Sequence, residues 1–275
     1  MPLEPLQVFT WSLLLVMIVE FYAIVVPGLE RGPAIGLGCL YGVFAVGCTI
    51  MGFMACKVDP MDHNVGAHAG AGSSTQERTF CFLCQVHVNK GSRHCRYCDK
   101  CVARFDHHCR WLNNCIGGTN YRYFVMLLVS TLGLTGLQLA LSIWLIVLFH
   151  TQSEGDPLYQ RIDDRYGSLS SDGYIIIVYV FAVMVLPFVG LLIQLIGFHM
   201  MLAREGLTTY DYIIREQKRE REKREKRARK EAGAQAAREA RSSTHGRSSV
   251  TNDEGRDAPL AATAGRQQTR PRSMV

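Results

Sequence analysis

The sequence predicts an α-helical polytopic membrane protein with four transmembrane helices and a cytosolic, cysteine-rich domain between helices two and three. Hydrophobic residues make up 48% of the 275 residues and are concentrated in four long stretches. Each stretch approaches or exceeds the roughly 20 apolar residues that cross about 30 Å of hydrocarbon. In addition, seven of the ten cysteines lie between Cys81 and Cys115. The predicted spans cover about 8–26, 34–56, 123–149 and 174–202.

Residues 1–56 hold the first two spans. The first could instead be a signal peptide, but no basic residue precedes it, Glu20 lies inside it and no small-x-small cleavage motif follows it. Buried helices of a soluble protein are another alternative, yet spans two and four contain no charged residue. Membrane spans are therefore favoured. An ionisable residue inside a span is costly, so Glu20 is either protonated or has a partner or a function, and we assign it no role.

Several residues inside the spans suit helix packing. Gly38 and Gly42 form a GxxxG motif in span two, which permits close helix approach. Pro187 predicts a kink in span four, and Gln194 and His199 give that span polar positions that prefer the bundle interior or the cytosolic interface. We interpret these residues as structural rather than catalytic.

Lys and Arg near the span ends predict the orientation, because positively charged loops stay cytosolic. The segment between spans two and three and the tail after span four are rich in both residues. The loop over 150–173 instead has two Arg against five acidic residues. We therefore expect that loop in the lumen, and both termini and the cysteine-rich domain in the cytosol. Cytosolic thiols stay reduced, so the cysteines indicate a metal or catalytic site rather than disulfides.

Residues 203–275 form a predicted cytosolic tail. Its part over about 215–241 is dense in Arg, Lys, Glu and Ala, which favours a solvated charged helix, and from Ser242 on we expect disorder. The basic excess also suits anionic membrane lipids. It does not suit nucleic acid, because interleaved aromatics are missing. The terminal residues 273–275 resemble a PDZ-domain ligand, which would dock as an added strand.

A connector over 57–78 precedes the cysteine-rich domain, which we place at 79–122. The connector is rich in Gly, Ala, Ser and His without apolar periodicity, so we expect it to be flexible and cytosolic. Asp59 and Pro60 mark the predicted end of span two.

The cysteine-rich domain has long, regular spacing. From Cys81 to Asn120 the pattern is Cys-x2-Cys-x9-His-Cys-x2-Cys-x2-Cys-x4-Asp-His-His-Cys-x5-Cys-x4-Asn. Structural zinc takes four Cys or His ligands, and Cys-x2-Cys pairs are its commonest signature. The two such pairs imply two zinc ions and eight ligands. Seven Cys and three clustered His are present, so two of these ten groups are not needed as zinc ligands.

The surplus groups can form a nucleophilic site. A His can take the proton of a nearby thiol, and a carboxylate can fix the imidazole tautomer. The run Asp106-His107-His108-Cys109 offers all three groups, with Cys109 as the candidate nucleophile. Cys109 lies fourteen residues before span three, near the membrane face, where transfer of a lipid chain needs a thiol. The alternative is a RING-like or treble-cleft module in which all these residues serve zinc.

Motif and topology together resemble the DHHC-type protein S-acyltransferases, or palmitoyltransferases. The resemblance covers the cysteine-rich core through Asn120 and Phe124 and the four spans, about 8–211. It implies transfer of a long-chain acyl group from palmitoyl-CoA, or another long-chain acyl-CoA, to membrane-proximal cytosolic cysteines of protein substrates through an acyl-Cys109 intermediate. It also implies an endoplasmic reticulum or Golgi membrane. The alternative from another class is a catalytically weak, membrane-anchored zinc-binding scaffold.

The resemblance implies a role for each matching residue. Cys109 would be the nucleophile, His107 the general base and Asp106 the group that orients His107. Trp111 would pack near the thioester or anchor at the membrane interface, and Arg110 would face the coenzyme A phosphates. The implied ligands are Cys81, Cys84, His94 and Cys101 for one zinc, and Cys95, Cys98, His108 and Cys115 for the other.

The chain departs from the family pattern in two motifs. The Thr-Thr-x-Glu that follows the fourth span in the family stands here as Thr208-Thr209-Tyr210-Asp211, and Asp shortens the reach of the carboxylate by one methylene. Met61 stands where the family has Gly after Asp-Pro. We expect these departures to bear on transfer to protein substrates rather than on self-acylation.

Overall fold

Among the residues that the computed structural model describes, four helical segments are long and apolar enough to cross a membrane, which confirms the predicted fold class. They extend a few residues beyond the apolar stretches because polar end residues continue each helix. The structure describes residues 4–65, 78–153, 155–167 and 171–246. The spans are Pro5–Gly28, Arg31–Lys57, Tyr121–Thr151 and Ser171–Glu205.

The first span consists of α1 (Pro5–Glu20), the π-helical turn η1 (Phe21–Val25) and α2 (Val26–Gly28). Glu20, which we left without a role, stands directly before the π turn and is only 5% exposed. Its carboxylate accepts a hydrogen bond from Gln138 Nε2, and the Tyr41 hydroxyl donates to Gln138 Oε1 at 3.0 Å. A buried polar network thus links three spans.

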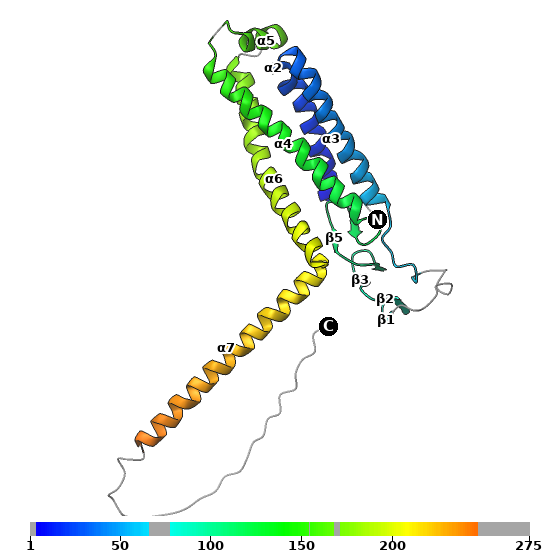
Figure 1. Cartoon of the computed structure of the whole chain (residues 1–275), viewed down its shortest axis with the longest axis vertical. Coiled ribbons are helices and arrows are strands. Elements are labelled where there is room, and N and C mark those ends of the chain that lie inside the picture. Colours follow the sequence, from blue (N-terminus) through cyan, green and yellow to red (C-terminus); the bar gives the residue numbers. More distant parts are fainter. Residues whose placement is uncertain (1–3, 66–77, 154, 168–170, 247–275) are drawn as a thin grey trace, which may run out of the picture. The chain divides into compact units, whose positions relative to one another are not determined.

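The remaining spans are α3 (Arg31–Lys57), α4 (Tyr121–Thr151) and α6 (Ser171–Glu205), with α4 packed against both others (Figure 1). The GxxxG motif of α3 faces Tyr22 of η1. A Cβ on Gly42 would lie 3.0 Å from the Tyr22 hydroxyl, which itself donates to the Gly38 carbonyl at 2.7 Å. The small residues therefore admit a tyrosine from the first span. On α6, Gln194 is exposed and His199 is buried.

A short helix that we did not predict, α5 (Pro157–Tyr166), lies in the segment between α4 and α6. Leu158 and Ile162 are at most 1% exposed and join the membrane-bundle core. Arg161 Nε donates to the Gly28 carbonyl at 3.2 Å, which ties α5 to the end of the first span. The loop over 150–173 is therefore partly helical.

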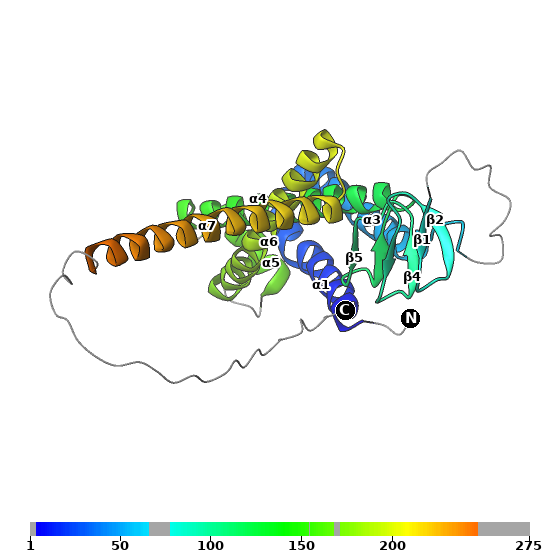
Figure 2. The same ribbon diagram turned by 90° about the horizontal axis from the view of Figure 1, so that it is seen from below.

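In the described part of the chain the strands form three antiparallel hairpins, which Figure 2 shows as one group. Two-stranded ribbons of this length are not stable alone, so the hairpins need further support. They pair β1 (Arg78–Cys81) with β2 (Val86–Asn89), β3 (Arg93–Cys95) with β4 (Lys100–Val102), and β5 (His107–Cys109) with β6 (Asn114–Ile116).

The predicted flexible connector is wrong for residues 58–65. Met61 forms a β-bridge with Val102, and the backbone N–H of Asp62 donates to the Cys101 carbonyl at 2.9 Å. Asp62 itself is fully buried. A buried carboxylate and backbone hydrogen bonds fix this segment against the hairpins. An apolar periodicity in its sequence is therefore not needed. The rest of the connector, 66–77, lies outside the described residues.

Helix α7 (Thr209–Gly246) begins six residues before the predicted charged helix. It also continues through 242–246, where we expected disorder. The chain divides into two compact units, residues 1–216 and 217–275, so the greater part of α7 belongs to the second unit. The predicted PDZ ligand lies outside the described residues.

Candidate functional site

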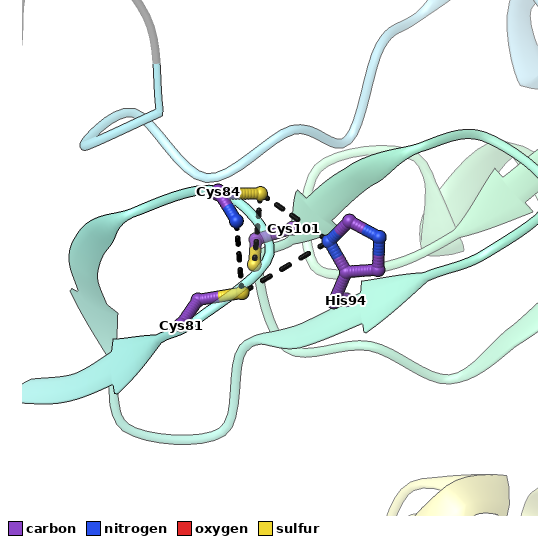
Figure 3. Close-up of side chains that lie close together, drawn as sticks. All are labelled: Cys81, Cys84, His94 and Cys101. Carbon is purple, nitrogen blue, oxygen red and sulfur yellow. Dashed lines mark hydrogen bonds between the residues drawn. The ribbon is translucent and has the colours of Figure 1, made fainter. Parts of the chain in front are cut away.

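The first predicted zinc set is gathered in space. The donor atoms of Cys81, Cys84, His94 and Cys101 lie within 4.8 Å of one another (Figure 3). His94 Nδ1 lies 3.2 Å from Cys84 Sγ, which lies 3.7 Å from Cys101 Sγ. Zinc bonded to sulfur at about 2.3 Å separates tetrahedral donors by about 3.7 Å, so the four residues fit zinc. Burial raises the pKa of the Cys101 thiol, and a bound dication would replace its proton.

The second set, Cys95, Cys98, His108 and Cys115, is equally close. His108 Nδ1 lies 3.4–3.8 Å from the three sulfurs, and Cys98 Sγ lies 3.3 Å from Cys115 Sγ. The two sets interleave because neighbouring strand residues point to opposite faces. A zinc ion here would join the second hairpin to the third, which supplies the support that the short ribbons lack.

The three hairpins repeat one turn. Cys81, Cys95 and Cys109 occupy the same strand position, and each pairs across a four-residue loop. The fourth loop residue has positive φ in every case: Gln85 at 56°, Asp99 at 48° and Asn113 at 50°. A second Cys follows three residues after the first in hairpins one and two, as Cys84 and Cys98, but Leu112 takes that place in hairpin three.

This repeat explains why Cys109 is free of both metal sets. Leu112 cannot ligate a metal, so the third turn lacks the thiol pair that the other two possess. The period of 14 residues between Cys81, Cys95 and Cys109 is visible in the sequence and could have distinguished Cys109 without counting ligands.

Asp106, His107 and Cys109 form a connected set. His107 Nδ1 lies 2.7 Å from Asp106 Oδ2, and the His107 side chain also hydrogen-bonds with Cys109. Burial alone would lower the pKa of His107, but the bonds to Asp106 and Cys109 raise it to about 9. The Asp106 carboxyl is 4% exposed. Burial opposes its ionisation, yet hydrogen bonds from His107 and Thr209 hold its pKa below the usual range.

Thr209, at the start of α7, donates twice to Asp106. Its backbone N–H reaches Oδ1 at 2.9 Å and its hydroxyl reaches Oδ2 at 2.7 Å. Asp211 lies away from this contact, in the first turn of α7: Thr208 Oγ1 caps the helix by accepting from Asp211 N at 3.1 Å, and it donates to Asp211 Oδ2 at 2.9 Å. The shortened carboxylate therefore serves the helix end.

Two asparagines fasten the hairpins to the end of α3. Asn120 is fully buried; its Oδ1 accepts from Gly117 N at 2.9 Å, and its Nδ2 donates to the Ala55 carbonyl at 3.2 Å. Asn114, which we did not single out from the sequence, donates to the carbonyls of Ala55 and Val58 at 2.9 and 3.1 Å. These carbonyls belong to the last turn of α3 and the residue after it, which have no partner within the helix.

The wall around Cys109 is apolar and comes mainly from the spans. Cys109 is 7% exposed and packs with Ala55, Leu112, Phe124 and Leu128.

His199 of α6 also lies in this region, although its polarity was the only sign of this in the sequence. Its Nδ1 lies 3.0 Å from the Tyr121 hydroxyl, and its ring centre lies 5.2 Å from that of Phe124 and 6.3 Å from that of His107. The fourth span thus contributes an imidazole beside the site.

Arg110 and Trp111 are at the surface. Arg110 pairs with Glu4 at 3.5 Å, and the Trp111 side chain is half exposed. The suggested roles of both residues remain predictions.

Comparison with known proteins agrees with the site. The DHHC palmitoyltransferase family matches residues 74–216. The human palmitoyltransferase ZDHHC11 is 30% identical over 249 residues, which cover 80% of this chain and 59% of the relative. Probable protein S-acyltransferase 22 of Arabidopsis thaliana is 46% identical over 146 residues, or 52% of this chain and 24% of the relative.

The match extends beyond half of the chain and includes both metal sets, the Asp106–Cys109 run and Thr209. The chain spans about three fifths of the length of the first human relative. It belongs to the DHHC palmitoyltransferase family.

Proposed function

We propose that this protein is a protein S-acyltransferase that moves a long-chain acyl group, such as palmitoyl, from acyl-CoA to cysteines of protein substrates. The observation that carries the proposal is the hydrogen-bonded series Asp106–His107–Cys109, which stands against the apolar wall of Phe124 and Leu128. The reaction needs a base beside the thiol and an apolar surface for the fatty chain. A thiol at this position has both.

In the first step His107 takes the proton of Cys109, and Asp106 stabilises the imidazolium that forms. The Cys109 thiolate attacks the thioester carbonyl, and the coenzyme A thiolate leaves with the proton from His107. In the second step a substrate thiol gives its proton to His107 and attacks acyl-Cys109, which releases the Cys109 thiolate for reprotonation. Each step exchanges one thioester for another, so no outside energy source is needed.

The two metal sets would hold one structural zinc ion each. Zinc bound by three thiolates and one imidazole is a closed site without an open position for chemistry. His94 and His108 would therefore keep the hairpins folded, and only the spare group His107 would move a proton.

The charge pattern supports an orientation with both termini and the hairpins in the cytosol, in an endoplasmic reticulum or Golgi membrane. The protein substrates would carry cysteines close to the cytosolic membrane face, because Cys109 lies beside the end of α3. Arg110 would approach the coenzyme A phosphates once it exchanges its ion pair with Glu4.

The second candidate is a membrane-anchored zinc scaffold without turnover. Substitution of Cys109→Ser separates the two functions, because Cys109 belongs to neither metal set. We expect the serine variant to contain two zinc ions per chain by elemental analysis and to lose labelling by an alkynyl palmitoyl-CoA. Undiminished transfer of the label to a protein substrate by this variant would refute the mechanism.

A further inference from the structure

Four basic residues follow one face of α7 within the second unit of the chain. Arg219, Lys223, Lys226 and Lys230 are separated by four, three and four residues, and all are exposed. Side chains at this spacing lie on one side of an α-helix, here over about 16 Å at 1.5 Å per residue. We call these four residues the basic stripe. Lys223 also pairs with Glu220 at 2.7 Å in an exposed contact.

The other positions in the same turns have a smaller excess of positive charge. Off the stripe, residues 218–230 contain five basic residues (Lys218, Arg221, Arg224, Arg227, Arg229) and three acidic residues (Glu220, Glu222, Glu225). Opposite charges there leave a net charge of +2 over nine positions, whereas the four stripe positions carry +4. The positive charge of this part of α7 is therefore concentrated along one line.

Only a short segment of chain connects the stripe to a transmembrane helix. The last transmembrane helix ends at Glu205, and Arg219 follows only 14 residues later. Between them, Thr209 is fixed to Asp106, and Arg215 pairs with Glu205 at 2.7 Å. A tether this short gives the stripe a high effective concentration at the surface of its own bilayer.

We propose that the basic stripe binds anionic lipid headgroups of the leaflet from which α7 emerges. The inference rests on the proposed cytosolic orientation, since the cytosolic leaflet carries the anionic lipid. Basic residues beside such a surface are attracted additively, and concentration of the charge on one helix face lets several residues approach together. Lipid binding by the basic stripe does not depend on protein acylation, so the two can be tested separately.

The experiment uses the full chain in nanodiscs of phosphatidylcholine, with or without phosphatidylserine. A glutamyl endopeptidase then reports access to α7, because it cuts after glutamates that every variant retains. We expect phosphatidylserine to slow this cleavage roughly tenfold, and high salt to restore the rate. Equal cleavage in both kinds of nanodisc would overturn the proposal.

Two variants of equal charge complete the test. One replaces the stripe (R219Q, K223Q, K226Q, K230Q), and the control replaces four basic residues off the stripe (K218Q, R221Q, R224Q, R238Q). The stripe variant should be cleaved at one rate with either lipid, whereas the control should remain protected by phosphatidylserine. Equal loss of protection in both would show attraction by net charge alone and would refute the stripe. Both variants should self-acylate like the wild type, because no substituted residue touches Asp106, His107 or Cys109.

Discussion

Thr209 holds the carboxylate of Asp106 with two hydrogen bonds, of 2.9 Å from its backbone and 2.7 Å from its hydroxyl. The two residues are 103 positions apart, so the segment after the fourth span sets the orientation of the group that in turn binds His107. The contact couples the tail of the transmembrane bundle to the proposed proton transfer.

The substitution Thr209→Val removes the hydroxyl and keeps the shape and the backbone bond. Hydrogen bonds to a charged group contribute about 1.5–3 kcal/mol, so the rate of self-acylation should fall about tenfold to a hundredfold. Thr209→Ser keeps a hydroxyl and should retain most of the activity. Fluorescent palmitoyl-CoA labelling measures the rate, and unchanged zinc content shows intact folding. An unchanged rate in the valine variant would contradict a role for this hydroxyl.

The adjacent residues His107 and His108 should respond in opposite ways. His108 lies in a metal set, so His108→Ala should lower the zinc content below two per chain and remove self-acylation through unfolding of the hairpins. His107 lies outside both sets and bonds to Asp106. His107→Ala should keep both zinc ions and still lose most self-acylation. Loss of zinc from the His107 variant would place that residue among the ligands and refute its role as base.

Local spacing predicts the metal sets and the spans because each depends on residues close together in the sequence. About 20 consecutive apolar residues identify a span, and Cys-x2-Cys identifies half of a zinc site. The bonds between Thr209 and Asp106 and between Glu20 and Gln138 join residues more than 100 positions apart. No local pattern marks such partners.

The structure of the segment over 58–65 also depends on partners that no local pattern marks. Its polar composition without apolar periodicity resembles a flexible connector, but tertiary contacts bury Asp62. Helix α5 was missed although its apolar residues recur at helical spacing: Leu158 and Ile162 are buried, and Tyr159 and Tyr166 pack against the same core. It has only ten residues, about half the length of the apolar stretches that identify spans.

Asp62 should stabilise the hairpins above acidic pH. Its carboxylate accepts hydrogen bonds from the Ser92 hydroxyl and from the backbone N–H groups of Asn64 and Asn89. Burial opposes ionisation, but these bonds hold the pKa of Asp62 below its ordinary value of 3.8. A carboxyl with a depressed folded-state pKa contributes stability above its unfolded pKa and loses it as the pH falls through the folded value.

Asp62→Ala leaves these donors unpaired and should make the hairpins about 1–3 kcal/mol less stable. Hydrogen exchange of residues 58–65 and 86–92 should be faster than in the wild type between pH 7 and 5. The difference should begin to narrow only below about pH 4 and should close once the pH falls below the depressed folded-state pKa, where the wild-type carboxyl is protonated too. A Ser92→Ala control, which loses one bond, should show a smaller change of the same sign. A difference that grew with acidification would contradict the assigned role.

Glu20 should stabilise the membrane bundle through its hydrogen bond rather than through its charge. The bond joins it to Gln138, which also accepts from Tyr41. Glu20→Gln retains an acceptor for Gln138 and should unfold at the wild-type temperature or above, because an amide avoids the cost of an ionisable group in hydrocarbon. Glu20→Leu removes the bond. Polar pairs inside membranes contribute about 0.6–1.7 kcal/mol, so the midpoint of thermal unfolding in detergent should fall by about 2–6 °C. Both variants should self-acylate, since neither touches Cys109. Loss of self-acylation in the glutamine variant alone would show that the carboxyl group itself is required, which contradicts a purely structural role.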